Sequence, residues 1–334
     1  MDLSGKRIAV TGAGGFIGAT VCRLATERGA EVVGLDADPG REARVREAGA
    51  DFVACDVTDA DAVGRALDGW PLVVHTAAIV TEWGDMDEFE RVNVGGTHNV
   101  MVAASRAERV VHLSSVAIWG AELKRDVHED EPPRPCGNPY VDTKGASELV
   151  ARRRGATIVR PGDVYGPGSV PWAIRIVKGL RSGVLRIPGR GDGLITPVYV
   201  DDLAECVLLA LTHPDGAGGV FTAWSGERVP VHAFFGSYAR MLGKPKAPSI
   251  PVPVARVVAG AEELLGRVTG RHPTATTFGL RYVSRRYAYD SPRAREVLGW
   301  EPQVSLSEGM RRTEAWLRKT GHLPPLPPAP RSPG

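Results

Sequence analysis

The sequence predicts an α/β fold, a doubly wound parallel sheet with a smaller C-terminal lobe. Short apolar, β-branched runs alternate with helix-like segments over the first half of the chain. This alternation is typical of a parallel sheet that helices cover on both faces. A glycine-rich turn follows the first run, and the alternation stops after Pro161, where glycine and proline become frequent. A length of 334 residues allows about two such units.

The predicted elements follow one another with short turns between them. Six runs are predicted to be strands: Arg7–Thr11, Glu31–Leu35, Ala50–Ala54, Leu72–Thr76, Val110–Ser114 and Ala156–Arg160. The helices predicted between them are Phe16–Glu27, Arg41–Ala48, Asp59–Leu67, Glu88–Ser105 and Tyr140–Arg153. Val198–Leu211 is predicted to be a strand entering an apolar helix that packs back on the first unit. Val252–Val268 is predicted to be an amphipathic helix, too interrupted by charges to span a membrane.

These elements suggest two units and a tail. Residues 1–161 are expected to form a dinucleotide-binding unit that also receives about 197–225. Residues 162–196 and 226–320 are expected to form the smaller lobe, to which the substrate would bind. Six of the 26 prolines lie in the final segment, so residues 321–334 are expected to form a disordered, proline-rich tail.

The composition argues against several classes of function. There are 41 basic and 39 acidic residues, so no strong overall field would draw the chain onto nucleic acid or anionic lipid. Four widely spaced cysteines without a CxxC pair argue against a disulfide framework or a zinc site. The N-terminus has no apolar stretch of signal-peptide length. A cytoplasmic protein with no nucleic-acid and no membrane partner is therefore expected.

The glycine-rich turn has the spacing of a dinucleotide-binding loop. Gly12 allows a tight turn, Gly15 lets the backbone approach a pyrophosphate, and Gly18 lets the helix pack close to the strand. The pyrophosphate would lie at the helix N-terminus, which Phe16 and Ile17 begin. A glycine triplet alone also fits a plain tight turn, but the strand–turn–helix context favours the dinucleotide site.

The ends of the next strands supply further cofactor candidates. Asp36, 18 residues after Gly18, can accept hydrogen bonds from the adenosine ribose and would repel a 2′-phosphate. We therefore expect NAD rather than NADP, with a plain loop carboxylate as the alternative. Asp56-Val57 suit the adenine edge, and Ala77-Ala78 are small enough to let the cofactor lie close.

Tyr140 and Lys144 lie at i and i+4, which places them on one face of a helix. A lysine close to the phenol would lower the pKa of Tyr140. The tyrosine would then exchange a proton with a carbonyl or alcohol while a hydride moves to or from a nicotinamide. Ser115, just past the fifth strand, could orient that carbonyl, or it could be only a strand-end cap. His75 and His112 lie in apolar strands and are expected to be hydrogen-bonded core residues, and no metal site is expected.

Ten motifs together make the chain similar to the extended short-chain dehydrogenases/reductases of the NAD-dependent epimerase/dehydratase superfamily. They are TGAGGFIG (11–18), Asp36, Asp56-Val57, HTAA (75–78), NVGGT (93–97), HLSSVAIWG (112–120), YVDTK (140–144), RPGDVYGPG (160–168), VYVDDLA (198–204) and LGWEP (298–302). The resemblance implies a Rossmann-type NAD domain and a catalytic set of Ser115, Tyr140 and Lys144. It also implies cofactor contacts from Tyr140, Lys144, Asn93, Pro161 and Val164. It further implies a homodimer formed through Glu88–Ser105 and Tyr140–Arg153.

Departures from the family's patterns narrow the function. Val116-Ala117 stand where the dehydratases carry Asp-Glu, which disfavours dehydration. Asp163 stands where sugar-nucleotide epimerases usually have asparagine, and Leu194–Pro197 lacks the arginine that holds their diphosphate, although Arg190 could substitute. RPGDVYGPG and TPVYVDDLAE look closer to the 3-beta-hydroxysteroid dehydrogenase and dihydroflavonol reductase branch. The candidates for an apolar substrate pocket, each equally compatible with the core, are Trp83, Trp119, Val164 and Trp172.

Three functional hypotheses follow. The first is an NAD-dependent oxidoreductase that interconverts a secondary alcohol and a ketone on a small-molecule substrate, such as a steroid or another bulky apolar compound, with Tyr140 as acid and base. The second is a nucleotide-sugar epimerase that uses bound NAD for transient oxidation. The third is a non-catalytic dinucleotide-binding sensor, which ranks last because the chain keeps both Tyr140 and Lys144.

Overall fold

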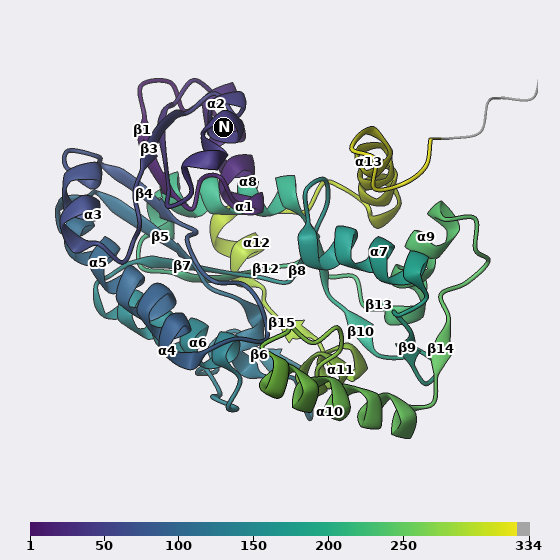
Figure 1. Ribbon diagram of the computed structural model, residues 1–334. Coiled ribbons are helices and arrows are strands. Elements are labelled where there is room, and N and C mark those ends of the chain that lie inside the picture. The colour runs from purple at the N-terminus through teal and green to yellow at the C-terminus, as the bar shows by residue number, and fades with distance from the viewer. Residues whose placement is uncertain (326–334) are drawn as a thin grey trace, which may run out of the picture.

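The computed structural model of the chain describes residues 1–325 and has a parallel sheet of seven strands at its centre (Figure 1). The spatial order of the strands is β12-β7-β5-β4-β1-β2-β3. Their bounds are β1 Arg7–Thr11, β2 Glu31–Asp36, β3 Asp51–Ala54, β4 Leu72–His75, β5 Arg109–Leu113, β7 Thr157–Pro161 and β12 Val220–Ala223. The predicted doubly wound α/β fold is confirmed, and β12 is a strand of this sheet that the sequence analysis missed.

Helices cover both faces of the sheet because its strands are apolar on both sides. Ile8 and Val10 of β1 pack into the core on one face, and Ala9 packs into the core on the other. The first face is covered by α1 (Phe16–Glu27), α2 (Glu42–Glu47), α8 (Val200–Thr212) and α12 (Arg293–Leu298). The second face is covered by α3 (Ala60–Leu67), α5 (Gly96–Ala103) and α6 (Pro139–Arg153).

The strand order reverses between β1 and β4, which are neighbours in the sheet. From β1 the chain first moves outward through β2 and β3, and it then crosses back to β4, β5 and β7. Ligands of open α/β sheets bind at the carboxyl ends of the strands beside such a reversal. The glycine loop after β1 and the segment after β4 therefore meet at the expected place for a cofactor.

The helix predicted over Glu88–Ser105 is interrupted. The chain forms α4 (Met86–Phe89), a π-helical turn over Glu90–Gly95 and then α5. A π-turn adds one residue to a helical turn and so changes the direction of the side chains that follow. Here it carries the buried Asn93, whose side chain faces the loop after β4.

The C-terminal lobe has its own apolar core, around Tyr165, Phe234 and Tyr238. Its helices are α7 (Arg175–Ser182), α9 (Val231–Met241), α10 (Val252–Thr269), α11 (Thr277–Ser284) and α13 (Leu306–Lys319). The remaining strands form two-stranded sheets: β8 (Asp163–Tyr165) with β11 (Pro197–Tyr199), β9 (Ile187–Pro188) with β14 (Ser249–Ile250), β10 (Leu194–Ile195) with β13 (Val229–Pro230), and β6 (Val127–His128) with β15 (Tyr289–Asp290). No helix among residues 1–325 is long and apolar enough to cross a membrane.

The tail predicted over 321–334 is only partly described. Leu323 is buried in the core of the lobe. Residues 326–334, which hold most of the tail, lie outside the described residues. The sequence-based boundaries between the two units stay a prediction.

Candidate active site

The glycine loop brings the backbone of β1, α1 and the segment after β4 into close contact. Gly12 has φ +68°, and a methyl group there would lie 2.7 Å from the backbone nitrogen of Ala77. A methyl group at Gly18 would collide with the carbonyl oxygen of Gly12. No side chain caps the N-terminus of α1, which begins after Gly15. Its first N–H groups are therefore left for an anionic ligand, and the cradle fits a pyrophosphate.

Gly12→Ala is expected to weaken NAD binding by at least about tenfold, because the left-handed backbone costs roughly 1–2 kcal/mol and the new methyl group pushes against Ala77. Isothermal titration with NAD would measure the loss. Gly5→Ala is the matched control, because Gly5 has φ +74° and no heavy atom within 4 Å of the added methyl group. This control is expected to lose a little stability and to bind NAD normally. Equal NAD affinity in both variants would contradict the role of the loop.

Asp36 connects the end of β2 to the glycine loop. Its Oδ2 accepts a hydrogen bond from the Gly14 backbone N–H at 2.9 Å, and its Oδ1 accepts one from the Asp38 N–H at 3.1 Å. A carboxylate has about four lone-pair sites, so acceptor capacity remains for ribose hydroxyls. Arg41 lies beside this group, with its Nε 3.3 Å from Asp38 Oδ2 and 4.0 Å from Asp36 Oδ1. The residues present therefore fit NAD.

The other cofactor candidates surround the same end of the sheet. Asp56 is exposed after β3, and its Oδ1 accepts a hydrogen bond from the Thr58 N–H at 2.9 Å. Val57 is buried against Gly96 of α5. Four further candidates are half-buried at or near the glycine loop, namely Phe16, Ile17, Ala77 and Ala78. Pro161 and Val164 are buried at the end of β7 and in β8. Their contacts with a cofactor stay predictions.

Asn93 ties the loop after β4 to the helix that carries the predicted acid and base. Its Oδ1 accepts a hydrogen bond from the Ile79 N–H at 2.8 Å, and its Nδ2 donates to the Ile79 carbonyl at 3.3 Å. Nδ2 also donates to Thr143 Oγ1 at 3.0 Å. Because Asn93 is buried and its side chain bonds to both Ile79 and Thr143, it positions the loop after β4 against α6 in this structure.

The predicted catalytic residues come from two neighbouring elements. Ser115 follows β5 and caps the short helix after it, where its Oγ accepts a hydrogen bond from the Ala117 N–H at 3.0 Å. Tyr140 lies in the first turn of α6, where the N-cap Asn138 accepts hydrogen bonds from the backbone N–H groups of Tyr140 and Val141. Lys144 is buried, and its Nζ donates to the Leu113 carbonyl at 2.6 Å. The strand-end cap considered for Ser115 is therefore present.

The protonation of this group differs from the sequence-based prediction. Burial raises the pKa of Tyr140, a hydrogen bond with the side chain of Ser115 partly offsets this, and the Asp163 carboxylate raises it further. The expectation that Lys144 lowers this pKa is wrong for this structure, because its ammonium group is directed to the Leu113 carbonyl. Burial also lowers the pKa of Lys144 to about 8, against the opposing effect of Glu148. Tyr140 is therefore a protonated phenol at neutral pH, suited to donate a proton.

The two strand histidines are core residues, as predicted. His75 lies between the hydroxyls of Thr11, 2.7 Å from Nδ1, and Thr97, 3.0 Å from Nε2. His112 Nε2 lies 3.3 Å from Ser147 Oγ of α6. Burial lowers the pKa of His75 to about 3, and that of His112 well below its usual value. Both imidazoles are therefore neutral and serve packing.

Asp163 is buried in a cluster that joins the sheet to the lobe. Its Oδ2 accepts hydrogen bonds from the Thr196 backbone N–H at 2.7 Å and from Arg285 Nη2 at 2.7 Å. Its Oδ1 accepts one from the Tyr282 hydroxyl at 2.8 Å. The Arg285 guanidinium lies 3.7 Å from the centre of the Tyr282 ring. The charge at Asp163 is thus compensated within the protein. Sequence reasoning missed Arg285 and Tyr282, which are more than 100 residues away in the chain.

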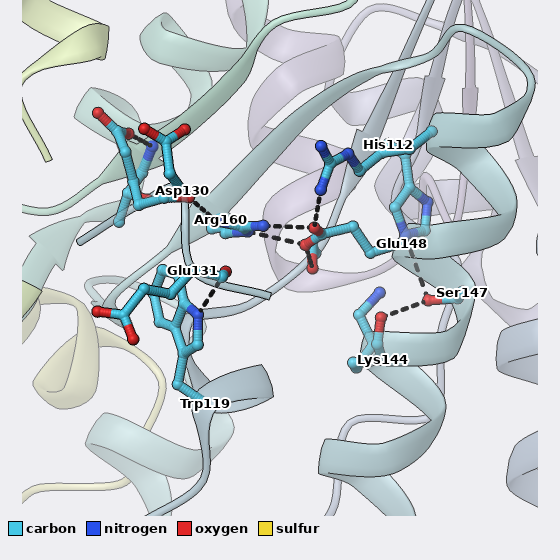
Figure 2. A network of polar contacts seen from close by, with 12 residues as sticks. His112, Trp119, Asp130, Glu131, Lys144, Ser147, Glu148 and Arg160 are labelled. Atoms are coloured by element: carbon cyan, nitrogen blue, oxygen red, sulfur yellow. Dashed lines mark hydrogen bonds and ion pairs between the residues drawn. The ribbon is translucent and has the colours of Figure 1, made fainter. Parts of the chain in front are cut away.

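A second buried ion pair joins Glu148, one turn after Lys144 on α6, to Arg160 of β7 (Figure 2). Glu148 and Arg160 are both fully buried, and Arg160 donates to the Glu148 carboxylate through Nε at 2.8 Å and Nη2 at 2.5 Å. Ser114 Oγ donates to Glu148 at 2.7 Å, and Arg160 Nη1 donates to the Glu129 carbonyl at 2.5 Å. The pair connects α6, β5 and β7. The four-residue spacing of Lys144 and Glu148 places Glu148 on the same face of α6 as the predicted catalytic residues, and the sequence analysis did not use it.

Two of the proposed substrate residues, Trp172 and Trp83, lie beside side chains or helices of the C-terminal lobe. Trp172 is half-buried, with its ring centre 6.4 Å from that of Tyr282 and 6.0 Å from that of Phe234. Trp83 is half-buried in the loop after β4, where it contacts Gly266 of α10. The contacts of Trp172 and Trp83 with a substrate stay predictions.

Two further substrate candidates, Trp119 and Arg190, are not part of this group. Trp119 is buried in the core beneath Arg160, whose guanidinium lies 4.8 Å from the ring centre, and its Nε1 donates to the Glu131 carbonyl. Arg190 is highly exposed on the turn between β9 and β10, where it pairs with Asp192 at 3.5 Å. The structure therefore assigns Trp119 to the core and leaves Arg190 outside the residues gathered around Tyr140.

Comparisons with known proteins agree with this geometry. The sequence model of the NAD dependent epimerase/dehydratase family matches residues 8–222. A 2-alkyl-3-oxoalkanoate reductase from Stenotrophomonas maltophilia is 32% identical, over 92% of this chain and 98% of its own. A UDP-glucose 4-epimerase from Mycolicibacterium smegmatis is also 32% identical, over 93% of this chain and 98% of its own. The solved structure of MoeE5 in complex with UDP-glucose and NAD has a TM-score of 0.72 and 25% identity, and covers 94% of this chain and 99% of that chain.

Proposed function

Since the chain belongs to the NAD-dependent epimerase/dehydratase family, whose members bind NAD, we propose that it is a ketoreductase for an alkyl-rich, apolar substrate. The proposed reaction reduces a ketone to a secondary alcohol with NADH. The Stenotrophomonas relative named as a 2-alkyl-3-oxoalkanoate reductase supports this substrate class.

The Asp163 cluster is the observation that carries this proposal. Family epimerases usually have asparagine at this position, facing a diphosphate, whereas here a carboxylate is buried and bound to Arg285, Tyr282 and Thr196. A buried charge pair is costly to open, because each partner would be left unpaired. The cluster therefore supports a substrate without a diphosphate.

The chemistry that we assign to the side chains of this protein is proton transfer to the oxygen of the substrate carbonyl. The glycine loop and Asp36 would hold the nicotinamide cofactor, which in its reduced form, NADH, would supply the hydride. Tyr140 donates its phenol proton to the carbonyl oxygen, and Ser115 orients that oxygen by a hydrogen bond. Lys144 and Asn93 hold α6 and its neighbouring loop in position. The raised pKa of Tyr140 supports its role as proton donor, because the phenol is protonated before the substrate arrives.

A nucleotide-sugar epimerase is the second candidate, favoured by the 32% identity to the Mycolicibacterium UDP-glucose 4-epimerase. It would use the same tyrosine for oxidation and re-reduction without net use of cofactor. The two functions therefore differ in whether NADH is consumed: the ketoreductase uses one NADH for each ketone reduced, and the epimerase uses none overall.

The test is nicotinamide absorbance of the purified protein with NADH and a panel of ketones. A 2-alkyl-3-oxo acid and a 3-oxosteroid are expected to consume NADH in proportion to the alcohol formed. Incubation with UDP-glucose or a dTDP-sugar is expected to give no isomerised sugar. Isomerised sugar without net change in NADH would contradict the proposal and establish the epimerase.

A further inference from the structure

Helix α10 presents one entirely apolar face outward. The α10 stripe consists of Val254, Val257, Val258, Ala261, Leu264, Leu265 and Val268, which recur at the three- and four-residue spacing of one helix face. Its six larger side chains are 44–78% exposed. In Figure 1 α10 runs along the lower edge of the lobe, with the rest of the protein on one side of it. A contiguous apolar surface of this kind marks an interaction site.

The opposite face of α10 is fixed to the protein. Ala259 and Gly266 are its buried residues. The carboxylates of Glu262 and Glu263 are turned inward, where they accept hydrogen bonds from the backbone and hydroxyl groups of Thr274 and Thr277. The orientation of the stripe is therefore set by four hydrogen bonds, and the two acidic residues of the helix are engaged away from the stripe.

The surroundings of the stripe are basic. Between Lys244 and Arg286 the sequence has eight basic residues and two acidic ones, although the whole chain has a net charge of only +2. The two acidic residues are Glu262 and Glu263, which face the protein. Exposed arginines of this segment are Arg256, Arg267, Arg271, Arg281 and Arg286, of which Arg281 pairs with Glu122. An outward apolar stripe flanked by arginines is complementary to a partner that offers an apolar layer with anionic groups at its boundary.

We propose that the α10 stripe docks the enzyme on an anionic lipid membrane. The valines and leucines would enter the boundary between headgroups and acyl chains, and Arg256 and Arg267 would reach the lipid phosphates. Four charged residues within α10 fit a helix that lies on a membrane and not one that crosses it. Pairing of two stripes from two copies is disfavoured, because it would bring two sets of arginines together. The proposal replaces the sequence-based expectation of no membrane partner.

The docking helix is connected to the active site through two segments. Thr81 Oγ1, in the loop after β4, lies 2.7 Å from His272 Nε2 just beyond α10, and Trp83 of the same loop contacts Gly266. The next helix, α11, carries Tyr282, which donates to Asp163. α10 would therefore lie between a bound membrane and the segments that carry Trp83 and Tyr282. The docking itself does not depend on which reaction the enzyme catalyses.

Flotation of the full chain with lipid vesicles tests the proposal. The protein is expected to float with vesicles of phosphatidylcholine and phosphatidylglycerol, and more weakly with phosphatidylcholine alone. Val257→Glu/Leu265→Glu is expected to reduce binding at least about tenfold, since both charges would enter the lipid boundary. Arg256→Gln/Arg267→Gln is expected to reduce binding to the anionic vesicles by about fivefold per arginine, the factor that corresponds to about 1 kcal/mol. Val184→Glu is the matched control, because Val184 is 59% exposed outside α10, and it is expected to bind like the wild type.

Two results would overturn the proposal. The first is absence of flotation with anionic vesicles. The second is a combination of two observations: the wild type does not bind vesicles, and light scattering shows that it is an oligomer which Val257→Glu/Leu265→Glu dissociates. This result would make the stripe a subunit interface. Leu149 is exposed on α6, in the region where the family resemblance predicts a dimer. An oligomer that Leu149→Glu dissociates, and Val257→Glu/Leu265→Glu does not, would be formed through that region and not through the α10 stripe. Circular dichroism checks that each variant is folded.

Discussion

Replacing Tyr140 by phenylalanine is expected to lower kcat for ketone reduction by about 10²–10⁴-fold, the usual contribution of a positioned general acid. The substitution removes the proton that the carbonyl oxygen would receive and keeps the aromatic ring in the first turn of α6. The N-cap hydrogen bonds of Asn138 go to backbone groups and remain. NADH consumption at saturating substrate would measure kcat.

The control for this experiment is Tyr287→Phe, because Tyr287 is 38% exposed and outside the site. It removes the same hydroxyl group and is expected to leave kcat unchanged. Full activity of Tyr140→Phe on the identified substrate would contradict the proposed proton transfer.

The raised pKa of Tyr140 also sets the sign of a pH dependence. Reduction needs the protonated phenol, which is present throughout the neutral range, so Tyr140 is not expected to limit its rate there. Oxidation of the alcohol needs the phenolate, whose fraction grows with pH, so the rate of oxidation is expected to rise with pH. Rates measured in both directions between neutral and alkaline pH check this, and an oxidation rate that falls over that range would contradict the assignment.

The sequence predicted those parts of the site that depend on local spacing. The glycine loop and the pairing of Tyr140 with Lys144 on one helix face follow from residues within a few positions of one another. The direction of a long side chain does not follow from spacing. Lys144 was expected to act on the phenol, but its ammonium group donates to the Leu113 carbonyl, and burial decides the pKa of Tyr140.

Contacts between distant segments were beyond sequence reasoning. Asp163 was singled out as an unusual residue, but its partners Tyr282 and Arg285 belong to α11 and the segment just after it in the C-terminal lobe. The periodicity of Val252–Val268 predicted an amphipathic helix, and α10 confirms it. Periodicity alone cannot tell which face is packed, and here the valines and leucines are the outward face because Glu262 and Glu263 bind the loop before α11.

Glu148→Gln is expected to have the largest effect on stability, lowering the free energy of unfolding by about 3–5 kcal/mol, the usual cost of removing one partner of a buried ion pair. The substitution keeps the shape of the side chain and leaves the charge of Arg160 without its carboxylate in a fully buried position. It also removes the charge that raises the pKa of Lys144, so this pKa is expected to fall further below about 8. Urea unfolding measures the first effect, and titration of Lys144 followed by NMR measures the second.

The double variant Glu148→Leu/Arg160→Met separates loss of charge pairing from loss of packing. Replacing both partners of a buried ion pair with apolar residues of similar size is often neutral or stabilising, whereas a single replacement leaves an uncompensated charge. The double variant is therefore expected to unfold at a higher urea concentration than Glu148→Gln. Because Glu148 is absent from both variants, both are expected to show the lowered pKa of Lys144. Equal stability of the two variants would mean that packing of α6 against β5 and β7, and not the ion pair, is what Glu148 provides. An unchanged pKa of Lys144 in both would exclude Glu148 as the group that holds Lys144 in its charged form.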